Sequence, residues 1–216
     1  MVAVPIKPEY GPTLGRLLSP RWRAASPPAR GLVRLAIVAL IALLVGAFLT
    51  LENAHYSHGG GTPFGFSYRG LYRVAPEPGE FVRLERHGSG GRLEDSYAVR
   101  PLTLAPYTGW QTGELALYAA GYINRLRASD RNFVLRGEGK TRVNAVPAYQ
   151  VVYTTVLGGR KMYGRNVLLL PQRPRARHGV SIVMLTSPTA NAQVTSPSEV
   201  ASEGVLLRPL KTFALG

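Results

Sequence analysis

The pattern of hydrophobic and polar positions changes twice along the chain, and each change marks a predicted boundary. Residues Leu35 to Leu51 form an apolar run without a single charged side chain. With Leu32 and Val33 the run reaches about twenty residues, enough for one α-helical crossing of a bilayer core. A core helix of a globular domain would carry a polar face, and this run has none. The pattern therefore predicts a transmembrane helix over residues 31–51.

The segment before the run, residues 1–30, is basic and rich in proline, which predicts a tail without stable structure. Positive residues crowd in front of the run, whereas no Lys or Arg follows it until Arg69. The positive-inside rule then predicts a single-pass protein of the cell membrane, with a cytoplasmic N-terminus and an outer C-terminal domain. A signal peptide cleaved after Ala47 is the alternative. Because the apolar run continues to Leu51, the pattern favours a retained anchor.

Beyond the run, residues 52–63 contain three consecutive glycines and are predicted to be a linker. From Phe64 onward, alternation predicts strands over 64–68, 81–85, 92–99, 133–136, 141–144, 148–157, 161–170, 180–185 and 205–215. Gly158-Gly159 predicts a hairpin between two of them. Helical spacing predicts a helix over 113–128 capped by Thr112, and Ser196 to Glu199 predicts a capping box that opens a short helix. Residues 64–216 are therefore predicted to form one extracytoplasmic α+β domain.

This order of elements resembles the PsbP-like family of α/β/α sandwiches. The resemblance rests on Asn144-Ala-Val-Pro-Ala-Tyr149 before the hairpin and on Pro209-Leu-Lys-Thr-Phe213 near the end of the chain. At the first of these steps the family carries a glycine that this chain lacks. The resemblance implies a mostly antiparallel sheet with helices on both faces. It also implies binding, assembly or accessory functions without a shared catalytic site.

Composition restricts the chemistry of the chain. The chain has no cysteine, which excludes disulfides, thiolate metal sites and cysteine nucleophiles. Its net charge of +14 fits an anionic partner such as lipid or a cell-wall polymer, although the excess of arginine also fits a bias of composition. Nucleic acid is not expected, because an exported domain rarely meets it. The predicted partners are therefore the membrane itself and another envelope protein or an anionic lipid or polymer.

Arg173, Arg175 and Arg177 form the one local concentration of charge outside the N-terminal part. Guanidinium groups in a loop beside a sheet bind phosphate or carboxylate groups well. These three residues are therefore the candidate binding residues, for an anionic ligand. A solvated loop without a ligand is the alternative.

No motif in the chain predicts a catalytic, cofactor or metal site. Gly139-Lys140-Thr141 resembles the end of a phosphate-binding loop, but the required earlier glycine is Val134, so Gly137 to Gly139 is predicted to be a turn between strands. His55 and His58 lack further ligands and are predicted to be solvated. His87 and His178 fall in predicted loops without an obvious partner.

Two further groups are candidates for hydrolytic chemistry. Ser89 lies among glycines but outside the pattern of a nucleophile elbow, and Glu94 and Asp95 should point to opposite faces of a strand. The sequence therefore predicts a non-enzymatic binding or assembly module. The alternative is an envelope hydrolase in which Glu94, Glu138 and a histidine line one deep pocket. A structural anchor whose cytoplasmic tail does the work is a third possibility.

Overall fold

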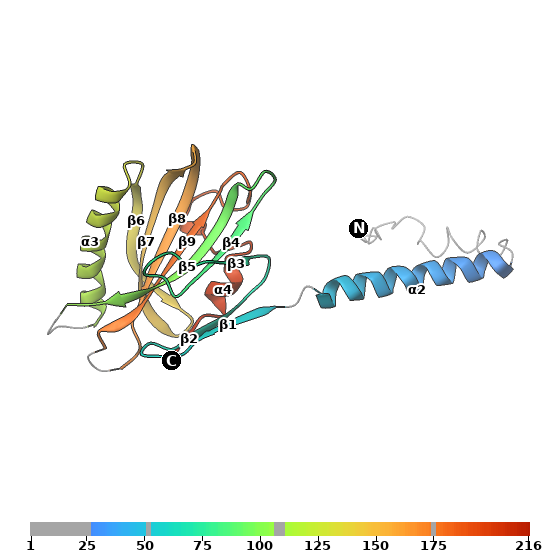
Figure 1. The fold of residues 1–216 in the computed structure, drawn as a ribbon, viewed down its shortest axis with the longest axis horizontal. Coiled ribbons are helices and arrows are strands. Elements are labelled where there is room, and N and C mark those ends of the chain that lie inside the picture. Colours follow the sequence, from blue (N-terminus) through green and yellow to red (C-terminus); the bar gives the residue numbers. More distant parts are fainter. Residues whose placement is uncertain (1–26, 51–52, 106–110, 174–175) are drawn as a thin grey trace, which may run out of the picture. The chain divides into compact units, whose positions relative to one another are not determined.

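A computed structural model describes residues 27–50, 53–105, 111–173 and 176–216, so the predicted tail over residues 1–26 lies outside the described part. The chain divides into two units, residues 1–52 and 53–216. The first contains helix α2 (Pro27–Thr50), whose large apolar side chains between Leu32 and Leu43 are each at least 50 % exposed where described (Figure 1). In the described ranges no helix combines the length and the apolar character that crossing a membrane requires. The predicted transmembrane helix stays a prediction.

The second unit is built on a seven-stranded sheet in which all neighbouring strands are antiparallel. Its order is β3 (Tyr72–Val74), β4 (Val82–His87), β5 (Leu93–Thr103), β9 (His178–Thr186), β8 (Arg160–Leu169), β7 (Val146–Leu157) and β6 (Val134–Val143). A second sheet contains β1 (Ala54–His58), β2 (Phe64–Tyr68) and β10 (Ala214–Leu215). The α+β class and the antiparallel sheet predicted from the sequence are confirmed.

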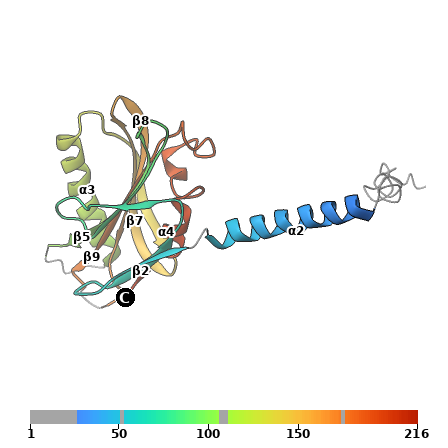
Figure 2. The ribbon, with the colours of Figure 1, turned by 45° about the vertical axis from the view of Figure 1, so that its right-hand side comes forward.

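Apolar side chains form a core on each face of the large sheet. On one face, helix α3 (Gln111–Ser129) buries Leu115, Ala119 and Ile123 against β7 and its neighbours. On the other face, the small sheet, the 3₁₀ helix η1 (Pro197–Glu199) and helix α4 (Leu207–Lys211) cover the second core. Figures 1 and 2 show α3 and α4 on opposite sides of the large sheet. Because α3 packs mainly on β7 and β6, no helix of the described residues covers the β4–β5 part of the same face.

Local sequence explains the central hairpin. Val151, Val152 and Tyr153 lie in a β-branched and aromatic run that suits a strand with two buried faces. Gly158 and Gly159 have φ values of 56° and 76°, the left-handed pair that a tight two-residue hairpin turn requires. The predicted hairpin is confirmed. The predicted N-cap is wrong, because α3 already begins at Gln111 and so includes Thr112.

The predicted linker over residues 52–63 is wrong in its first half. Ala54–His58 form β1, which pairs in antiparallel register with β2. The ring of Tyr56 packs 5.5 Å from the ring of Phe66, between centroids. Tyr56 is the one large apolar side chain of β1 and stands between polar residues in the sequence, so the alternation was too short to predict a strand. The three consecutive glycines follow β1 and connect it to β2. The folded unit therefore begins at Asn53 and not at Phe64.

Two further element predictions differ from the structure. Gly137 to Gly139 form no turn: β6 is one continuous strand with a bulge at Arg136, where the register passes from Leu135 to Gly137. The predicted final strand over 205–215 is mostly α4, with only Ala214–Leu215 in β10. Leu206 and Leu210 both pack on the core. Their spacing of four residues fits one face of a helix and also one face of a strand, so a segment this short does not separate the two patterns.

Strand β5 is longer than the predicted strand over 92–99, because it continues through Pro101 to Thr103. The backbone oxygen of Val99 accepts from the N–H of Phe81, so the backbone groups of Val99 face β4. Two residues on, Pro101 faces the same side, where β4 has already ended. Its missing N–H therefore removes no hydrogen bond from the ladder.

Candidate functional site

The predicted arginine loop connects β8 to β9, and its members differ in their surroundings. Arg177 is half-buried: its Nη1 donates to the backbone oxygen of Ala105 and lies 3.7 Å from Oε1 of Glu114 on α3. Arg173 is exposed, and Arg175 lies outside the described residues. Arg177 therefore ties the loop to α3, and the hypothesis of an anion site on these three residues stays a prediction.

A pocket of about 380 Å³ lies at the same end of the sheet as this loop, where β9 begins with His178. Its polar lining consists of His58, Thr62, Thr103 and His178. Sequence reasoning placed one of these histidines in a linker and the other in a loop, and the structure brings both to one pocket. The two histidines belong to different sheets, so their meeting depends on how the small sheet packs beside the large one, which is not visible in the sequence.

Both imidazoles of this pocket are fixed by neighbours. The ring of His58 packs between Phe64 and Phe81, with centroid distances of 5.1 Å and 4.3 Å. Nδ1 of His178 lies 3.4 Å from Oγ1 of Thr103. Among the residues that the structure describes, no carboxylate lines the pocket. Among the described residues, no group of three acidic or histidine side chains could hold a metal ion.

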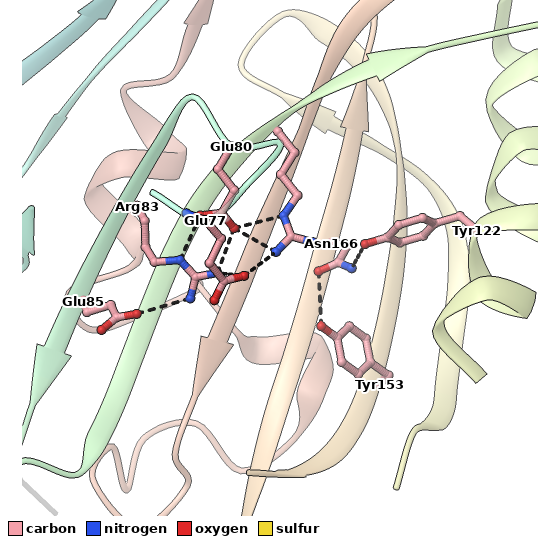
Figure 3. A network of polar contacts seen from close by, with 8 residues as sticks. Glu77, Glu80, Arg83, Glu85, Tyr122, Tyr153 and Asn166 are labelled. Atoms are coloured by element: carbon pink, nitrogen blue, oxygen red, sulfur yellow. Dashed lines mark hydrogen bonds and ion pairs between the residues drawn. The ribbon is translucent and has the colours of Figure 1, made fainter. Parts of the chain in front are cut away.

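A network of charged side chains occupies the helix-poor part of the α3 face (Figure 3). Glu77, Pro78, Gly79 and Glu80 form a turn in which the N–H of Glu80 donates to the oxygen of Glu77 at 3.0 Å. Gly79 has a φ of 84°, as the third position of a type II turn requires, and proline suits the second. This turn places the Glu80 carboxylate, whose side chain is 0 % exposed, over the sheet.

Two arginines from neighbouring strands bind this carboxylate. Its Oε2 accepts from Nε of Arg83 at 2.8 Å, and its Oε1 accepts from Nε and Nη2 of Arg100 at 3.0 Å and 2.8 Å. The more exposed carboxylate of Glu77 lies 2.7 Å from Nη2 of Arg83, and that of Glu85 lies 3.2 Å from Nη1. Nearly all acceptor positions of Glu80 are used within the protein, so the network fixes the turn to the sheet.

The stability of the folded unit depends on whether the Glu80 side chain is ionised or protonated. Burial raises the pKa of its carboxyl group, but the hydrogen bonds from Arg83 and Arg100 outweigh burial and lower the pKa from 4.5 to about 2. Because the pKa is lower in the folded state than in the unfolded state, the ionised carboxylate of Glu80 contributes its full stabilisation above the unfolded value of 4.5. This stabilisation is lost as the pH falls toward 2. We expect the free energy of unfolding of Glu80→Gln, measured in urea, to approach that of the native chain between pH 4.5 and pH 2. A difference that stays constant over this interval would contradict the assignment.

Beside this network, Asn166 of β8 connects two tyrosines (Figure 3). Its Nδ2 donates to the hydroxyl oxygen of Tyr122 at 2.6 Å, and its Oδ1 accepts from the hydroxyl of Tyr153 at 3.4 Å. Burial raises the pKa of both tyrosine hydroxyls, so both stay protonated at neutral pH. The trio therefore holds α3 on the sheet by neutral hydrogen bonds and supplies no base.

The residues of the hydrolase alternative are not brought together. Glu94 lies on β5 and Glu138 on β6, with β9, β8 and β7 between these strands in the sheet. Neither residue lines the pocket that contains His58 and His178. Asp95 is buried and engaged, with its Oδ2 2.6 Å from Nη2 of Arg86 and its Oδ1 accepting from Thr186 at 2.6 Å. Glu94 and Glu138 therefore do not share the deep pocket with a histidine that the hydrolase alternative requires.

No protein-family model and no curated protein matches the chain. Its fold is similar to the solution structure of cyanobacterial PsbP (CyanoP) from Synechocystis sp. PCC 6803, with 14 % identity, a TM-score of 0.51, and coverage of 77 % of this chain and 94 % of that one. It is also similar to LpqN of Mycobacterium tuberculosis, involved in cell envelope biogenesis, with 6 % identity, a TM-score of 0.51, and coverage of 76 % and 91 %. The chain has a PsbP-like fold, as the sequence resemblance implied.

Proposed function

We propose that this protein is a single-pass membrane protein whose outer domain is a binding or assembly module for another envelope component. The observation that carries this proposal is the apolar surface of α2. Its described leucine, isoleucine and valine side chains are exposed, and the uncharged run continues in sequence to Leu51. Exposed apolar surface of this extent calls for an apolar environment, which a bilayer supplies.

The proposed binding surface is the end of the sheet that carries the 171–177 loop and the His58–His178 pocket. Its support is electrostatic: arginines precede His178 in the chain, the described residues that line the pocket include no carboxylate, and the whole chain has a charge of +14. Such a surface fits an anionic partner, either an acidic face of an envelope protein or an anionic lipid or polymer. The role of LpqN in cell envelope biogenesis agrees with an accessory function of this kind.

The proposal is tested by cross-linking in membranes that contain the full chain. The test variant replaces Arg173, Arg175 and Arg177 with serine. The control variant replaces the exposed Arg127, Arg131 and Arg142 with serine, so that both variants lose the same charge. We expect the cross-linked partner to be lost from the first variant and kept by the second. Equal retention in both variants would retire the arginine loop as the binding surface, and equal loss would show an effect of total charge only.

Thermal unfolding of both variants separates lost binding from lost structure. Arg177 contacts Ala105 and Glu114, so its replacement is expected to loosen the loop. A partly exposed ion pair contributes about 1 kcal/mol or less to stability, so the folded unit should persist. Arg173→Ser alone is the milder variant for the case in which the triple variant unfolds.

A further inference from the structure

A second pocket, of about 430 Å³, lies at the opposite end of the large sheet, where the β4–β5 and β7–β8 hairpins turn. It is lined by Arg92, Leu93, Leu157, Gly158, Arg160 and Met162. β5 runs from Leu93 at this pocket to Thr103 at the pocket with the two histidines, so the sites are separated by the length of a strand. The volume lies within the usual range of small-molecule sites, roughly 300–1,000 Å³.

The uncharged lining of this second pocket is apolar. Met162 is 1 % exposed and forms its buried side, whereas Leu157 is 48 % exposed and lies toward solvent. Solvent-facing apolar side chains beside a concave surface are the usual composition of a site that takes an apolar group.

Two guanidinium groups belong to the same pocket. Nη2 of Arg160 donates to Oγ of Ser187 at 2.9 Å and to Oγ1 of Thr189 at 2.5 Å, and these two hydroxyls lie 2.8 Å apart. One edge of Arg160 is therefore fixed, and among the described residues its Nε and Nη1 have no hydrogen-bond partner. Arg92 follows Gly90 and Gly91 at the β4–β5 turn, and in the described part of the chain its side chain makes no ion pair.

Two other arginines of this sheet, Arg83 and Arg86, have the carboxylate partner that Arg92 and Arg160 lack. Arg83 lies 2.8 Å from Oε1 of Glu80, and Arg86 lies 2.6 Å from Oδ2 of Asp95. No carboxylate of the described part of the chain lines the pocket of Arg92 and Arg160. Two cations beside an apolar wall, one of them pre-oriented by hydroxyls, are complementary to an anion that carries an apolar chain.

We propose that this pocket binds an anionic head group, a carboxylate or a phosphate, at the end of a short apolar chain. The guanidinium groups of Arg92 and Arg160 receive the anion, and Leu93, Leu157 and Met162 receive the chain. This site does not depend on the proposed anchoring or on the arginine loop, since it uses neither.

The test uses methyl NMR of the full chain in phosphatidylcholine nanodiscs. The chain has three methionines, and Met184 is buried on the other face of the sheet, so its methyl group is an internal control for Met162. The probes are octanoate and octyl phosphate, which distinguish the two head groups. Octan-1-ol supplies the chain without charge, and acetate and inorganic phosphate supply the charge without a chain.

We expect octanoate or octyl phosphate to shift the Met162 resonance and leave that of Met184 unchanged. Arg92→Gln with Arg160→Gln should weaken this binding about tenfold or more, whereas Arg127→Gln with Arg131→Gln should leave it unchanged. Three results would overturn the proposal: no shift at Met162, equal binding of octan-1-ol, or binding of acetate or phosphate as tight as that of the chain-bearing probes. Met184 reports whether the double variant is folded.

Discussion

Replacing Gly179 by alanine is expected to destabilise the folded unit by about 3 kcal/mol, because the new methyl group has no room. A Cβ at this position would overlap the backbone oxygen of Leu169 and lie 2.9 Å from Cδ2 of Leu170. The oxygen belongs to β8, which pairs with β9 on one side and β7 on the other. It cannot move without disturbing the ladder, unlike the end of a flexible side chain.

The measurement is urea unfolding of Gly179→Ala beside Gly139→Ala. Gly139 lies in β6 at the edge of the sheet, and a Cβ there meets nothing within 4 Å. This control should change the free energy of unfolding by less than about 1 kcal/mol. The change should be stabilising, because alanine lowers the conformational entropy of the unfolded chain. Equal midpoints for both variants would show that the strands are not packed as described.

Replacing Glu80 by glutamine is expected to cost about 2–3 kcal/mol at neutral pH. The change keeps the shape of the side chain but leaves Arg83 and Arg100 without the buried carboxylate that they share. The two arginines then keep only the more exposed carboxylate of Glu77 and, for Arg83, that of Glu85, and water replaces the lost buried charge only in part.

Glu77→Gln is the matched control for this variant. Its side chain is 56 % exposed and contacts the same two arginines. An exposed ion pair contributes less than about 1 kcal/mol, so denaturant unfolding should separate the two variants clearly. If both changes had the same small effect, the network would be a solvated surface cluster that does not hold the turn of residues 77–80 on the sheet.

Periodic patterns were sufficient for the elements that bury one face over many residues. Helix α3 and the β7–β8 hairpin were predicted because their apolar positions repeat over several turns or pleats. Some short elements were not predicted from the sequence pattern. The five-residue strand β1 carries one large apolar side chain, and the five-residue helix α4 offers too few positions to separate a period of 3.6 from one of 2.

The sites depend on pairings that a sequence does not display. Glu80 and Arg100 are twenty residues apart, and their meeting depends on the register between β4 and β5. His58 and His178 come from different sheets. The arginine loop was visible as a local concentration of charge, but the contact of Arg177 with Glu114 depends on the position of α3. Charge density can be read locally, whereas partners across strands require the fold.

The proposed membrane anchoring by α2, with the folded unit outside the cell membrane, is tested most directly by finding the side of the membrane on which each part of the chain lies. The chain has no cysteine, so single cysteines can report the side on which each part lies. Glu203→Cys, at an exposed position of the folded unit, should react with a membrane-impermeant maleimide in intact cells. Thr13→Cys, before the apolar run, should react only after the membrane is opened. Reaction of Glu203→Cys only after lysis, or reaction of both variants in intact cells, would contradict the account.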